Sequence, residues 1–126
     1  MILIFGGAYQ GKLAYTLERF NLTESDVYRC SVDDVIVPEK KKIIYELDKW
    51  ILALTKTEIN IEELIIEFID KNRDAIVICN DISCGVVPLD PVLRKWREAA
   101  GRSLAKLSKA SDEVVRMFCA IPSRIK

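Results

Sequence analysis

Short apolar runs alternate along the chain with longer segments in which apolar residues recur every three or four positions. A continuous apolar run of strand length is typical of a parallel strand, because helices cover both faces of a parallel sheet. We predict such strands at 1–5, 27–30, 42–47, 75–79 and 114–119, the last ending before Pro122. The stretch 31–42 shows neither pattern.

The segments between these runs have helical periodicity. They predict helices from Gly11 to Phe20, over 50–55, between Asn60 and Asn72, and from Asp90 onwards. Asn60 is a good N-cap, and Glu63 three residues later completes a capping box. Strands that alternate with helices predict an α/β fold, here a single domain over residues 1–126 with a largely parallel sheet flanked by helices.

The last helix has the clearest start, because Asp90 provides an N-cap and Pro91 fits the first helical position. Gly101 lies inside this helix at a cost of about 1 kcal/mol relative to alanine. It indicates close packing against a neighbour or simple tolerance of glycine. Arg94 and Glu98 have the spacing of an ion pair. The residues expected to face inward are Val92, Trp96, Ala99, Ala100, Leu104 and Leu107.

The composition narrows the classes of function. Lysine and arginine together number 19, as do aspartate and glutamate, so no net positive field is available to hold nucleic acid. The chain has no histidine, which excludes histidine bases, Ser-His-Asp catalysis and histidine-ligated zinc. Every apolar run is shorter than the ~20 residues of a membrane span. We therefore expect a cytoplasmic protein with no nucleic-acid or membrane partner.

The four cysteines, Cys30, Cys79, Cys84 and Cys119, form no C-x-x-C pair. Cys79 and Cys119 fall in predicted buried strands, where a free thiol behaves as a small apolar side chain. This pattern predicts reduced thiols and no metal site. A site built from all four thiolates is the alternative.

A glycine-rich segment, Gly6-Gly7-Ala8-Tyr9-Gln10-Gly11-Lys12-Leu13, joins the first predicted strand to the first helix. It matches the G-x-x-x-x-G-K part of a P-loop, in which backbone amides surround phosphates and the lysine reaches the terminal ones. Leu13 stands where the motif has a serine or threonine that binds Mg²⁺. The plainer interpretation is a glycine-rich turn with a solvent-exposed lysine.

A second set of motifs lies in the last third of the chain. Residues 80–88 read N-D-I-S-C-G-V-V-P, 94–102 read R-K-W-R-E-A-A-G-R, 110–114 read A-S-D-E-V and 121–126 read I-P-S-R-I-K. With the glycine-rich segment, they resemble the adenosylcobinamide kinase / adenosylcobinamide-phosphate guanylyltransferase family (CobU type). That family has a GGARSGKS-like P-loop, then N-E-V-G-x-G-I-V-P, R-x-F-R-D-x-x-G-R, A-D-E-V and G-I-P-x-x-K. The resemblance implies a P-loop NTPase-like fold over 1–126.

The resemblance also implies the site. Lys12 is the implied catalytic residue, and GTP or ATP the implied nucleotide. The implied nucleotide-binding residues are Gly6, Gly7, Ala8, Tyr9, Gln10, Gly11, Lys12 and Leu13, with Cys30, Ser31 and Val32 after the second strand. The implied partners are a purine nucleotide, a cobinamide-type corrinoid and further copies of the chain in a homo-oligomer.

Departures from the family pattern bear on catalysis. The family histidine that accepts GMP has no counterpart, so a guanylyl-histidine intermediate cannot form on this chain. The family's acidic residue on the next strand aligns with Tyr45, with Glu46 or Asp48 as substitutes. Leu13 lacks the hydroxyl that binds Mg²⁺ in the family, so Mg²⁺ binding is not expected, and we predict no metal-binding residue.

Three functions stay open at this point. The first is a shortened family member that binds a nucleotide or corrinoid but is impaired in phosphoryl transfer. The second is an active adenosylcobinamide kinase with rearranged metal ligands. The third is a non-catalytic assembly or regulatory subunit.

Overall fold

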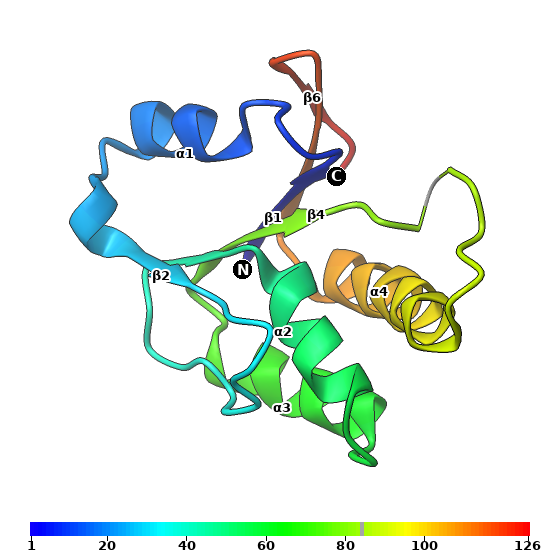
Figure 1. Cartoon of the computed structure of the whole chain (residues 1–126). Helices are drawn as coiled ribbons and strands as arrows, with labels where there is room; N and C mark the ends of the chain where they lie inside the picture. The colour runs from blue at the N-terminus through cyan, green and yellow to red at the C-terminus, as the bar shows by residue number, and fades with distance from the viewer. Residues whose placement is uncertain (84) are drawn as a thin grey trace.

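The computed structural model describes residues 1–83 and 85–126, and in this part of the chain six strands form one sheet in the order β2-β3-β4-β1-β5-β6 (Figure 1). The strands are β1 (Ile2–Gly6), β2 (Val27–Arg29), β3 (Ile43–Tyr45), β4 (Ile76–Asn80), β5 (Glu113–Phe118) and β6 (Ile121–Arg124). The first five are parallel, and β6 returns antiparallel to β5. The α/β class and the five predicted strands are confirmed, whereas β6 was not predicted.

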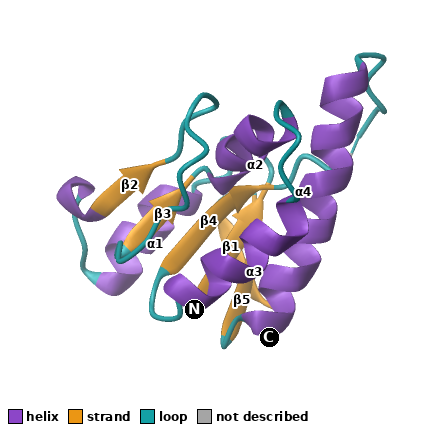
Figure 2. Ribbon diagram, turned by 90° about the horizontal axis from the view of Figure 1, so that it is seen from below, coloured by secondary structure: helices purple, strands orange, loops and turns teal. Residues whose placement is uncertain are grey.

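Four α-helices flank the sheet: α1 (Lys12–Phe20), α2 (Leu47–Thr55), α3 (Ile61–Lys71) and α4 (Pro91–Ala110). Figures 1 and 2 show α1 on one face and the other three helices on the opposite face. A single 3-10 turn, Glu24–Asp26, precedes β2. Among the described residues, no helix is long and apolar enough to cross a membrane.

The strand side chains alternate between two cores, as the pleat requires. On the side of α2, α3 and α4, Leu3 and Val77 pack with Trp50 and Phe68, whose ring centroids are 5.4 Å apart. On the other side, Ile4 and Ile78 belong to a smaller core covered by the apolar residues of α1. The sheet is therefore buried on both faces at its centre.

The start of α4 agrees with the prediction, whereas the start of α2 does not. α4 begins as predicted, with the Asp90 carboxylate accepting hydrogen bonds from the backbone of Val92 and Leu93. α2 begins at Leu47, earlier than the predicted 50–55, because Glu46 adopts a left-handed φ of 59° that ends β3 at Tyr45.

Three expectations about side chains were wrong. Val92 is 43% exposed, because it lies in the first turn of α4, next to the loop rather than over the sheet. Arg94 and Glu98 are both exposed and form no ion pair with each other. Cys119 is exposed in the turn between β5 and β6, not buried in a strand.

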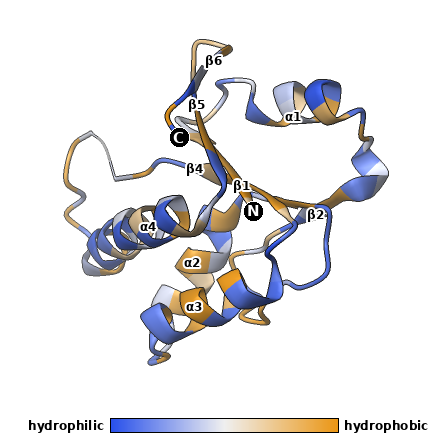
Figure 3. Ribbon diagram, turned by 180° about the vertical axis from the view of Figure 1, so that it is seen from behind, coloured by the Kyte–Doolittle hydropathy of each residue, from blue (hydrophilic) through white to orange (hydrophobic). Residues whose placement is uncertain are grey.

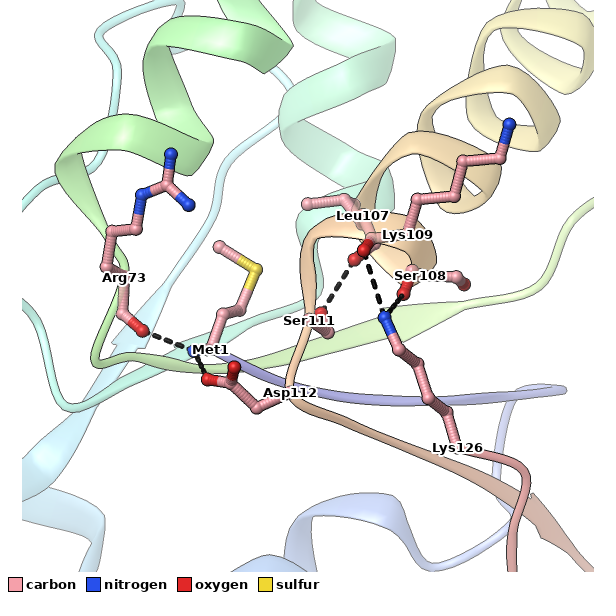
Figure 4. A network of polar contacts seen from close by, with 8 residues as sticks. All are labelled: Met1, Arg73, Leu107, Ser108, Lys109, Ser111, Asp112 and Lys126. Atoms are coloured by element: carbon pink, nitrogen blue, oxygen red, sulfur yellow. Dashed lines mark hydrogen bonds and ion pairs between the residues drawn. The ribbon is translucent and has the colours of Figure 1, made fainter.

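Polar contacts fix both ends of the chain near α4 (Figure 4). The Met1 ammonium donates to the Arg73 carbonyl and, over 3.0 Å, to the Asp112 carboxylate. The Lys126 ammonium donates to the Ser108 and Lys109 carbonyls, at 3.1 and 2.9 Å, where α4 ends. A cation at a helix C-terminus satisfies carbonyls that lack a partner within the helix.

Candidate nucleotide site

The glycine-rich segment forms the turn between β1 and α1, at the carboxyl edge of the sheet. Gly6 passes so close to β5 that a Cβ there would lie 2.4 Å from the Met117 carbonyl oxygen. Gly11 caps α1 with a left-handed φ of 81°, a conformation that favours glycine. Both glycines of the G-x-x-x-x-G motif are therefore required by the backbone.

Lys12 is the first residue of α1 and is only 5% exposed, so the plainer interpretation of a solvent-exposed lysine does not hold. Its ammonium folds back under the turn and donates to the Gly7 carbonyl over 2.6 Å. Burial lowers the pKa of Lys12, and the nearby Asp48, Cys79 and Glu46 oppose that shift. A buried cation at the start of a helix, next to a glycine-rich turn, is suited to bind an anion.

A cavity of about 420 Å³ opens over this turn. Its lining residues are Ala8, Tyr9, Gln10, Gly11, Lys12, Leu13, Ala14, Tyr45, Glu46 and Asn80. Six of the sequence-predicted residues, 8–13, are thus brought together around one space. The ends of β3 and β4 supply the opposite wall, as expected at the carboxyl edge of a parallel sheet.

Cys30, Ser31 and Val32 are not among the residues that line this cavity. They follow β2, which β3 and β4 separate from β1 in the sheet. The Cys30 backbone donates to the Tyr45 carbonyl over 3.0 Å. Burial raises the pKa of the Cys30 thiol to about 12. Their predicted contact with the nucleotide stays a prediction.

Two acidic residues follow β3 and have different surroundings. Glu46 lines the cavity and forms an ion pair of 2.6 Å with Lys49. Asp48 is 3% exposed, and its carboxylate accepts a hydrogen bond of 3.0 Å from the Asn80 backbone. Burial raises the pKa of Asp48. Glu46 is the carboxylate placed to meet a ligand, and Asp48 connects α2 to the end of β4.

The described residues do not fit a magnesium site of the P-loop kind. Leu13 has no hydroxyl, and the Thr16 hydroxyl one turn later is buried and donates to the Lys12 carbonyl over 2.7 Å. Glu46 is the one carboxylate among the residues that line the cavity. In the described part of the chain, no three acidic or cysteine side chains gather as metal ligands.

Sequence reasoning missed the support that β5 and β6 give to the turn. The Gln10 side-chain oxygen accepts a hydrogen bond from the Cys119 backbone. A Cβ at Gly11 would lie 3.5 Å from that of Ala120. Cys119 and Ala120 have left-handed φ values of 50° and 61°. The signal was weak, because neither residue is a usual left-handed turn residue.

The segment that begins the second set of motifs, 80–88, starts at the same carboxyl edge of the sheet. Gly6 of β1 pairs with Asn80 of β4, and the Asp81 backbone donates to the Gly6 carbonyl over 2.9 Å. The Ser83 hydroxyl donates to the Asp81 carboxylate over 2.6 Å. Cys84, part of the N-D-I-S-C-G motif and of the alternative four-thiolate site, lies outside the described residues.

Both tryptophans have structural roles. Trp50 is 1% exposed within the larger core. Trp96 is half-buried, and its indole N–H donates to the Asp48 carbonyl over 2.7 Å. This contact holds α4 against the start of α2, so neither ring is free to stack on a ligand in this arrangement.

A comparison with protein families matches residues 32–125 to cobinamide kinase / cobinamide phosphate guanyltransferase (CobU). The match begins after the glycine-rich turn, so it does not cover residues 6–13. No curated protein matches the chain. Since the family model covers most of the chain, this protein belongs to the cobinamide kinase / cobinamide phosphate guanyltransferase family.

Proposed function

We propose that this protein binds a purine nucleotide, GTP or ATP, with its phosphates in the glycine-rich turn. The observation that carries the proposal is the buried Lys12 ammonium under the turn, 2.6 Å from the Gly7 carbonyl. A phosphate oxygen would replace that carbonyl as the acceptor, so that both the donor and the acceptor of the hydrogen bond would carry a charge. The backbone amides of residues 6–13 would complete the cradle.

We further propose that catalysis is reduced relative to the family activity. The chain has no histidine to accept GMP, so guanylyl transfer through a phosphohistidine is closed to it. Leu13 removes a metal ligand that helps to neutralise the transferring phosphoryl group. A cobinamide-type corrinoid is the proposed second ligand, on the strength of the family alone.

The dependence of nucleotide affinity on Mg²⁺ tests the proposed loss of the metal ligand. Calorimetric titration with ATP or GTP should give the same affinity with and without Mg²⁺ for the wild type. Leu13→Ser restores the hydroxyl of the motif, and we expect it to make binding tighter in the presence of Mg²⁺. Wild-type affinity that depends strongly on Mg²⁺ would show that other groups hold the metal and would contradict the proposed impairment.

Active cobinamide kinase is the second candidate, and the position of Glu46 favours it. This carboxylate lines the cavity, and Mg²⁺ in kinases is often held by one or two carboxylates and the substrate phosphates. Phosphate transfer from labelled ATP or GTP to adenosylcobinamide distinguishes the candidates. Transfer that Lys12→Ala and Glu46→Gln both abolish would establish the kinase, and no transfer above background would leave a binding protein.

A further inference from the structure

A second cavity lies beside α4, apart from the nucleotide site. Its volume is about 410 Å³, and it shares no lining residue with the cavity over the glycine-rich turn. It is lined by Ser83, Val87, Arg94, Arg97, Glu98, Gly101 and Arg102. The loop after β4 forms one wall and α4 the other; Figure 1 shows how this loop leads from β4 to the start of α4.

Gly101 lies at the centre of the face of α4 that lines this cavity. Residues Arg97 and Arg102 lie about 140° apart around α4, and Arg94 and Gly101 fall between them. Because Gly101 has no side chain, the loop after β4 comes close to the middle of this broad face. A Cβ there would lie 3.5 Å from that of Ser83, in ordinary contact. Arg94, Arg97 and Arg102 all line this one cavity.

Within the described part of the chain, none of the three arginines that line the cavity forms an ion pair with a carboxylate. Among the described residues, Arg19, Arg29 and Arg73 each form an ion pair with a carboxylate, whereas Arg94, Arg97 and Arg102 form none. Glu98 is the one acidic residue in the lining, so the cavity carries an excess of two positive charges. The exposed face of α4 is strongly hydrophilic (Figure 3).

Arg97 is held in place and retains an unused donor. Its Nε donates to the Ser83 carbonyl over 2.9 Å, which fixes the guanidinium against the loop. Its Nη1 is buried and has no hydrogen-bond partner among the described residues. Buried donors are normally satisfied, so a donor left without an acceptor beside a cationic cavity favours an anionic ligand.

We propose that this cavity is a second anion site that binds a phosphate monoester with an apolar body. Guanidinium groups match the oxygens of phosphate in two-point hydrogen bonds, which supports phosphate as the charged part. Val87 in the lining is 59% exposed, and the neighbouring Val86 and Leu89 are each 94% exposed. Val87 provides an apolar surface next to the arginines for the rest of the ester, and Val86 and Leu89 add exposed apolar side chains in the same loop.

Titration with phenyl phosphate, followed by calorimetry and by the arginine Nε–Hε signals in NMR spectra, tests the proposal. We expect saturable binding, with affinity reduced about tenfold in Arg94→Gln and in Arg102→Gln. Both arginines are exposed, so these variants should keep the fold, which thermal unfolding checks. Lys109→Gln removes a charge from the same helix outside the cavity and should bind like the wild type.

Two further arms separate this site from the nucleotide site and test the apolar part. Lys12→Ala should bind phenyl phosphate normally even where nucleotide binding is lost. Val87→Ser should weaken phenyl phosphate but leave inorganic phosphate unchanged. The proposal is wrong if binding does not saturate, if Lys12→Ala abolishes it, or if Lys109→Gln weakens it as much as the arginine variants do.

Discussion

A substitution at Gly6 tests whether the close approach of this residue to β5 fixes the glycine-rich turn. Gly6→Ala would place a Cβ 2.4 Å from the Met117 carbonyl oxygen, so β1 and β5 would have to separate. We expect the free energy of unfolding, measured by urea denaturation, to fall by about 1–3 kcal/mol.

Gly7→Ala is the matched control in the same turn. A Cβ at Gly7 meets only the flexible Gln10 side chain, at 3.7 Å. Its unfolding free energy should therefore stay close to that of the wild type. Equal losses in the two variants would mean that the close approach of Gly6 to β5 is not what fixes the turn.

The lowered pKa of Lys12 predicts a particular pH dependence of nucleotide binding. Only the protonated ammonium attracts phosphate, and burial lowers its pKa below the ordinary value of 10.5. ATP affinity should therefore fall as the pH rises through the lowered pKa, before an ordinary lysine would lose its proton. Titrations at increasing pH measure this. The residual binding of Lys12→Ala should lack the decline; the same decline in that variant would assign it to another group.

At the residue scale, the sequence predicted the backbone shape of the glycine-rich turn better than it predicted the residues around that turn. The spacing of Gly6, Gly11 and Lys12 was enough to predict a tight turn that ends in a lysine at the start of a helix, because the motif itself specifies backbone shape and charge. Glu46 and Asn80 line the cavity over the turn because of the order of the strands in the sheet. No local sequence pattern predicts that order. That Lys12 is buried likewise depends on how α1 lies against the sheet.

At the scale of the elements, the buried Asp48 carboxylate connects α2 to β4, and its contribution to the free energy of unfolding depends on pH. Its pKa is raised by burial, so the folded protein binds a proton more tightly than the unfolded chain does. Its contribution to stability is therefore best below the ordinary pKa of 3.8 and is lost as the pH rises through the raised value. Asp48→Asn should remove that part of the pH dependence, measured as unfolding free energy from acidic to neutral pH.

Asp74→Asn is a suitable control for Asp48→Asn. It removes the same charge from an exposed position in the turn before β4. Its unfolding free energy should follow pH as the wild type does. If the two variants behave alike, the change reflects net charge and not the buried carboxylate.

The elements that sequence could predict are those with local signals. Asp90 and Asn60 accept hydrogen bonds from the first turns of α4 and α3, as their N-cap patterns indicated. β6 was missed because all four of its residues are exposed and one is proline, so it has no apolar pattern. The early start of α2 depends on the left-handed Glu46, which sequence does not indicate for glutamate.

At the scale of the whole molecule, we predict that copies of the chain associate. The hairpin of β5 and β6 exposes Phe118 and Ile121, at 63% and 67%, and β6 is a free edge of the sheet. Exposed apolar side chains at an unpaired edge favour contact with another chain. Light scattering should give a mass above 14.4 kDa, and Phe118→Ser should lower it. A wild-type monomer would contradict the prediction.

The central claim is that Lys12 and the glycine-rich turn bind nucleotide phosphates, and equilibrium titration with GTP and ATP tests it most directly. We expect the wild type to bind and Lys12→Ala to bind at least about tenfold more weakly, the loss of a charge-assisted contact. Lys109→Ala should match the wild type. Absence of binding by the wild type, or equal affinity of wild type and Lys12→Ala, would contradict the claim.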